Sequence, residues 1–141
     1  MTALAAELMV AQEGWTRKQL PLGPGLKAYK GGTAAADTSA HYVRPAASGN
    51  ANLIPLGIFA QTIDNSATTV NTALVDVDFL AEKKVLWRAN GNGITLASNF
   101  YALAYFLDDQ TWTSSSGGNS AAGRIVAVDS VLGVAVILGA S

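Results

Sequence analysis

The chain has 141 residues, of which half are hydrophobic, and nine basic and ten acidic residues give it a formal net charge of −1. This length is typical of one domain with a sizeable buried core, and the absence of a basic cluster argues against a nucleic-acid-binding surface. The sequence contains no cysteine, which excludes disulfides and thiolate chemistry and fits synthesis in a reducing cytosol.

Charged residues are unusually few. They make up 13% of the chain, against about 25% in an average soluble domain. A free monomer stays soluble through a charged surface, whereas large uncharged surfaces are typical of interfaces. We therefore expect partners to cover much of this surface.

A membrane location does not explain the low charge. The longest apolar run, residues 131–140, is interrupted by glycines and has half of the about 20 residues that a membrane helix needs. The N-terminus has no basic region ahead of its apolar part, and Glu7 interrupts that part, so it is a poor signal peptide. We expect no membrane association.

The first 25 residues differ from the rest of the chain. Residues 1–14 predict a short helix, because Leu4, Leu8 and Ala11 share one helical face and Gly14 follows them. Residues 15–25 contain two prolines and two glycines, which oppose a regular helix and favour an extended, irregular arm. We therefore divide the chain into an N-terminal arm, residues 1–25, and a β domain, residues 26–141.

The β domain reads as short strands separated by turn signals. In chain order, strands are expected within 26–37, 41–46, 53–63, 73–79 and 84–89. The run Asn-Gly-Asn-Gly at 90–93 predicts a hairpin to a further strand at 94–97. Residues 98–109 are expected to begin with a helical turn and become a strand through Tyr105 to Leu107. Residues 114–123 read as a surface loop, and strands at 124–130 and 133–138 close the chain.

This spacing predicts an all-β fold, namely an antiparallel sandwich or jelly roll or a small barrel, with the extended N-terminal arm. No internal repeat is evident in the sequence.

Asp76 and Asp78 lie two residues apart in the alternating run 73–79, and Val75 and Val77 have the opposite parity. A carboxylate pair raises the hypothesis of a small hydrolase, but any such pair on a strand has this spacing. Catalysis also needs one acid in an apolar cleft. We interpret both carboxylates as the solvated face of a strand.

Other catalytic and metal-binding patterns are weak. His41 is the only histidine, so a zinc site based on His and Cys has too few ligands, and neither a calcium-binding loop nor a nucleophile elbow is present. We expect no catalytic residues, no metal and no cofactor. Asp108 and Asp109 end an apolar strand and are typical of a turn.

The tryptophans have different settings. Trp87 lies in an alternating run and is expected in the core. Trp15 lies in the arm, which has little core of its own, so we expect it to pack against another subunit. Trp112 follows a turn and leads into a polar loop. The candidate partner contacts are Trp15, Leu20, Leu22 and Trp112.

Six segments, in order, resemble a known family. They are 27–46 with its "KGG" step, 55–66, 75–79, 100–113 with its "DD-x-T" end, 120–130 and 133–138. The pattern is similar to that of the capsid cement, or head decoration, proteins of tailed bacteriophages. The resemblance covers about residues 26–138 and implies a β-rich fold, often jelly-roll-like, without catalysis.

The resemblance implies a structural protein on the outside of the virion's icosahedral head, made in the host cytoplasm. There it would clamp neighbouring subunits of the major capsid protein. We also expect self-association, as homodimers first and trimers next. The alternative is a carbohydrate-binding jelly-roll module of a phage tail or receptor-binding protein, with Trp112 and the adjacent polar loop as its sugar platform.

Overall fold

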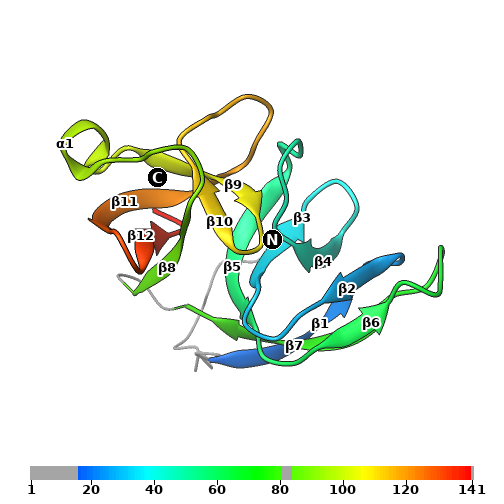
Figure 1. The fold of residues 1–141 in the computed structure, drawn as a ribbon. Helices are drawn as coiled ribbons and strands as arrows, with labels where there is room; N and C mark the ends of the chain where they lie inside the picture. Colours follow the sequence, from blue (N-terminus) through cyan, green and yellow to red (C-terminus); the bar gives the residue numbers. More distant parts are fainter. Residues whose placement is uncertain (1–15, 81–83, 141) are drawn as a thin grey trace, which may run out of the picture.

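The structure is a computed structural model that describes residues 16–80 and 84–140. Its described part is nearly all β, with one short helix, so the all-β prediction is confirmed. Figure 1 shows the arrangement of these elements. The elements are β1 (Arg17–Leu22), β2 (Leu26–Ala28), β3 (Thr33–Asp37), β4 (Tyr42–Pro45), β5 (Leu53–Phe59), β6 (Ile63–Asn65), β7 (Ala73–Phe79), β8 (Val85–Asn90), α1 (Leu96–Asn99), β9 (Leu103–Asp108), β10 (Thr111–Thr113), β11 (Ala121–Asp129) and β12 (Gly133–Leu138).

The strands close into two small barrels rather than one sandwich. The first barrel has the order β1-β4-β3-β5-β7, and the second has the order β10-β8-β12-β11-β9. The barrels lie side by side, with β8–β12 on the left of Figure 1. Strands β2 and β6 form a separate two-stranded ribbon. Of the predicted architectures, the small barrel is therefore the one that forms, and it forms twice.

Both barrels have the same strand order. In each, the first strand in the sequence pairs in parallel with the third and antiparallel with the fifth. In each, the second strand pairs antiparallel with the third and the fourth, and the fourth pairs antiparallel with the fifth. The chain thus contains a repeat of topology, although the sequence shows no evident repeat.

Each barrel has its own apolar core. Leu22, Phe59, Val75 and Val77 belong to the first core. The second is built around Phe106 and Trp112 with strands β11 and β12, and it also includes Ala35, Ala46 and Leu53 from the first barrel. Because the second core extends across the boundary, the two barrels pack against each other and orient one another.

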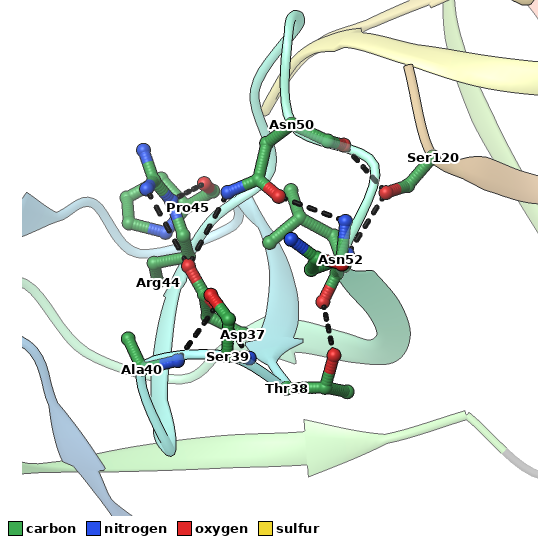
Figure 2. A network of polar contacts seen from close by, with 10 residues as sticks. Asp37, Thr38, Ser39, Ala40, Arg44, Pro45, Asn50, Asn52 and Ser120 are labelled. Atoms are coloured by element: carbon green, nitrogen blue, oxygen red, sulfur yellow. Dashed lines mark hydrogen bonds and ion pairs between the residues drawn. The ribbon is translucent and has the colours of Figure 1, made fainter. Parts of the chain in front are cut away.

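The polar contacts of Figure 2 add a second connection between the barrels. Ser120 lies just before β11, and its hydroxyl donates to the Asn50 carbonyl at 2.6 Å and accepts from the Leu53 amide at 2.8 Å. Nearby, the Gly49 amide donates to the Asn119 side chain at 2.7 Å. The loop that leads into β5 is therefore tied to the start of β11.

Part of the predicted arm is an integral strand. Residues 17–22 form β1, which pairs with β7 from Arg17 to Leu22 and with β4 at Leu22. Pro21 is compatible with this strand, because a proline is tolerated where one strand edge has little pairing. The irregular arm predicted for 15–25 is therefore wrong over these residues. Residues 1–15 lie outside the described residues.

The hairpin predicted at 90–93 does not form. The Asn90 side chain instead accepts from the Ile94 amide at 2.9 Å and donates to the Ile94 carbonyl at 2.8 Å. The Thr95 hydroxyl then caps α1 by accepting from the Ser98 amide. Local side-chain bonds therefore redirect the chain into a helical turn, and β8 pairs with β12 and β10.

Several other predicted elements are confirmed. Strand β7 spans residues 73–79, as expected, and β9 includes the strand expected through Tyr105 to Leu107. The strand predicted at 94–97 is wrong, because α1 begins at Leu96, ahead of the helical turn expected from residue 98. Strands β11 and β12 form an antiparallel pair, and Val134 and Val136 are buried.

Replacing Gly57 by alanine is expected to lower the free energy of unfolding by about 1–3 kcal/mol. Gly57 pairs with Phe79 where β5 runs antiparallel to β7, and a Cβ there would lie 1.9 Å from the Asp78 carbonyl oxygen. Urea denaturation measures the effect. Gly117→Ala is the control, because its nearest contact is 3.7 Å away, and its change should stay within about 0.5 kcal/mol. Equal stability of both variants would contradict this packing.

Candidate binding surface

A cleft of about 470 Å³ lies at the junction of the two barrels. One wall comes from the β2–β3 turn of the first barrel, residues 29–32, and the other from β8 of the second barrel. Residues Gln110, Val131 and Leu132, from the β9–β10 and β11–β12 turns, complete the lining. Binding clefts often lie between packed domains, so this is the candidate binding surface.

Arg88 fixes the position of the two walls. From β8 its guanidinium donates to the Thr33 hydroxyl at 3.0 Å and to the Gly31 carbonyl at 2.6 Å. Burial lowers the pKa of Arg88, while the nearby charge of Asp109 acts in the opposite direction. Burial also raises the pKa of Asp109, with the neighbouring Asp108 as a second cause. The Arg88 side chain therefore joins the two walls of the cleft through its hydrogen bonds to Thr33 and Gly31.

The rim of the cleft presents large apolar side chains. Val131 is 89% exposed, Leu132 57% and Tyr29 51%. The Asp129 carboxylate accepts from the Val131 and Leu132 amides, at 2.7 and 2.8 Å, and so fixes the turn that carries both side chains. The Lys27 ammonium lies 4.9 Å from the centre of the Tyr29 ring. Exposed apolar groups on rigid backbone suit adhesion to another surface.

A second exposed apolar group surrounds α1. Leu96, Phe100 and Tyr101 are all exposed, and the last two have ring centres 6.1 Å apart. Tyr101 has a φ of 58°, which is costly for a bulky residue. Its amide donates to the Ile125 carbonyl at 2.7 Å, and its ring lies 5.8 Å from the Arg124 guanidinium. Neighbouring strand β11 thus holds this aromatic pair at the surface.

The predicted partner contacts have different positions from those expected. Leu22 and Trp112 are each 0% exposed and lie in the first and second core respectively. The prediction that they contact a partner is therefore corrected, because neither reaches the surface. Leu20 is half-buried and lines an apolar groove on the first barrel. Trp15 lies outside the described residues.

Trp87 was expected in the core but is half-buried and lines the cleft. Together with Tyr29 it is a site residue that the sequence did not identify. The "KGG" step at 30–32 was a usable signal for one wall. The other wall depends on how β8 is placed against the first barrel, and this placement leaves no local signal in the sequence.

Asp76 and Asp78 form the outer face of β7, as expected, while Val75 and Val77 are fully buried. The Arg17 guanidinium donates to both carboxylate oxygens of Asp78 and thereby lowers the pKa of Asp78. A general acid needs the opposite shift. The geometry of Asp76 and Asp78 thus favours a role for Asp78 in a surface ion pair with Arg17 over the hydrolase hypothesis.

Within residues 16–80 and 84–140, no group of three or more His, Asp or Glu side chains is arranged to hold a metal ion. His41 is exposed in the β3–β4 turn with a φ of 63°. In the same described ranges, no helix is long and apolar enough to cross a membrane.

The β3–β4 turn is organised by Asp37, whose side chain is only 5% exposed. Its carboxylate accepts from the Ser39 amide and hydroxyl, the Ala40 amide and the Asn50 side chain, at 2.9–3.2 Å. It also lies 3.8 Å from Arg44. Figure 2 shows these groups converging on the carboxylate. Burial alone would raise the pKa of Asp37, but the donated hydrogen bonds lower it below the usual value.

This network predicts acid sensitivity. Because the folded-state pKa of Asp37 lies below the unfolded value of about 3.9, its carboxylate stabilises the fold at higher pH. That stabilisation is lost as the pH falls below about 4 and through the folded-state pKa. Asp37→Asn should therefore be less stable at pH 7 and lose less stability than the wild type on acidification. Urea denaturation at several pH values measures both, and equal pH slopes would contradict the assignment.

Comparison with known protein families, curated proteins and solved structures finds no match for this chain.

Proposed function

We propose that the chain is a capsid cement protein of a tailed bacteriophage, located on the outside of the icosahedral head. There it clamps neighbouring subunits of the major capsid protein and so stabilises the shell. The resemblance of residues 26–138 to this family motivates the choice of partner. The alternative, a sugar-binding module, loses its proposed platform because Trp112 is buried.

One observation carries the proposal. The chain is poor in charge, with 13% charged residues, and its described surface presents large apolar side chains at the cleft rim and around α1. Two barrels, each with its own core and packed against each other, hold these groups on rigid backbone. Many weak contacts of this kind act together on a closed shell, and binding only to the assembled shell stabilises it by mass action.

The test measures the temperature at which intact heads rupture, by calorimetry, as purified protein is added to heads that lack it. We expect the rupture temperature to rise and to saturate with added protein. Val131→Asp should weaken the effect, because it places a charge on the cleft rim. Val70→Asp is a matched control at a residue 79% exposed and outside the cleft lining. A rupture temperature unchanged by the wild-type protein would contradict the proposal.

Two related expectations belong to the same proposal. Sedimentation equilibrium should show self-association, with homodimers first and trimers next. A glycan array tests the alternative function, since a cement protein has no sugar specificity.

A further inference from the structure

An apolar groove of about 570 Å³ opens on the first barrel. Side chains from all five strands of this barrel line it, including Leu20, Tyr42, Leu56 and Phe79. Leu20 and Leu56 also pack against the core beneath. The groove lies beside the seam between β1 and β4, which pair at a single position, Leu22 with Val43.

The two barrels differ at one paired position beside this groove. Strands β4 and β10 are each the third strand of their barrel in chain order. The second residue of each strand, Val43 or Trp112, pairs with a residue of the strand before it. Val43 pairs with Ala36 in the first barrel, and Trp112 pairs with Phe106 in the second. In the second barrel these two aromatic rings, 6.0 Å apart, are fully buried. The first barrel has two small side chains at these positions, and both line the groove.

The chain enters the first barrel next to this groove. The Thr16 carbonyl accepts from the amide of Phe79, a lining residue, at 3.0 Å. Residues 1–15, which precede this point, lie outside the described residues, and most of them are hydrophobic. The segment therefore begins beside Phe79, at one end of the lining.

We propose that the groove is the docking site for the apolar N-terminal segment, residues 1–15, of the same chain. The groove offers an apolar lining for apolar side chains, and the segment is covalently attached at its edge. A short tether gives an effective concentration in the millimolar range, well above micromolar protein in solution. Docking within one chain therefore prevails over docking between copies. This inference does not depend on the proposed function.

Amide NMR spectra of the purified protein test the docking. Deleting residues 2–15 should shift the amide signals of Tyr42, Leu56 and Phe79 and leave those of the second barrel in place. Leu8→Glu in the full chain should reproduce these shifts, because it puts a charge on the apolar face formed with Leu4. Ala6→Glu adds the same charge on the opposite side of the predicted helix and should leave the groove signals unchanged.

The outcomes are decisive in both directions. Groove signals that do not respond to the deletion, or that respond equally to both glutamate variants, would overturn the docking. Both substituted residues precede the described strands, so both variants keep the sequence of every described strand unchanged. In a further spectrum of the wild type at tenfold dilution, the groove signals of Tyr42, Leu56 and Phe79 should keep their positions. Groove signals that move on dilution would show docking between copies and would overturn the assignment to one chain.

Discussion

Trp112→Ala is expected to lower the free energy of unfolding by about 3–5 kcal/mol, as for other large aromatic residues removed from a core. The indole is fully buried among Phe106, Ile125 and other core residues. Its Nε1 donates to the Leu86 carbonyl at 3.4 Å, so the substitution also removes a weak hydrogen bond between strands. Chemical denaturation followed by circular dichroism measures the change.

Phe100→Ala is the matched control, because it removes an aromatic ring that is 65% exposed. Its free energy of unfolding should change by about 0.5 kcal/mol or less. If Trp112→Ala were as stable as this control, Trp112 would not be a core residue, and its original interpretation as a partner contact would regain support.

Deletion of residues 2–25 is expected to abolish cooperative folding. It removes β1, whose residues pair with β7 over the whole strand and whose Leu22 is fully buried. Without β1 the first barrel has two unpaired edges and an open core. The free energy of unfolding of a domain is only about 5–15 kcal/mol, so we expect the loss of these contacts to exceed it. Near-ultraviolet circular dichroism and urea denaturation test this expectation.

Deletion of residues 2–15 is the control for that truncation, because it leaves every described strand in place. It should retain a cooperative unfolding transition. A cooperative transition in the longer deletion would show that β1 is dispensable and would restore the original boundary of the arm at residue 25.

The sequence was sufficient to predict elements whose signals are local. Alternation over 73–79 predicted β7 and the side on which Asp76 and Asp78 lie. The turn at Asp108 was also recognised, and its carboxylate accepts from the Gln110 amide at 2.8 Å. Such features depend on residues close together in the chain, so their physical causes can be read from a short window.

Features that depend on distant pairing were missed. Pro21 and the nearby glycines favoured an arm, yet residues 17–22 pair with residues 73–78, more than fifty positions away. The Asn-Gly run at 90–93 has a strong hairpin signal, but β8 finds its partners in β10 and β12. At residues 17–22, tertiary pairing outweighed the local turn preference. At 90–93, the local bonds of Asn90 to Ile94 and the pairing of β8 with β10 and β12 did so together.

The candidate surface was only partly predictable for the same reason. Low charge indicated an adhesive exterior, but not where it lies. Tyr29 and Val131 are about one hundred residues apart in the sequence and line one cleft because the two barrels pack together. Exposure of Trp112 was inferred from its polar neighbours, whereas cross-strand pairing with Phe106 directs it into the core.

Co-sedimentation tests the proposed role most directly. Purified protein is mixed with intact heads that lack it and, separately, with unassembled major capsid subunits at the same concentration. If the chain clamps neighbouring subunits, it pellets with the heads to a saturating amount and shows no association with free subunits. Equal binding to free subunits, or no binding to heads, would contradict the account.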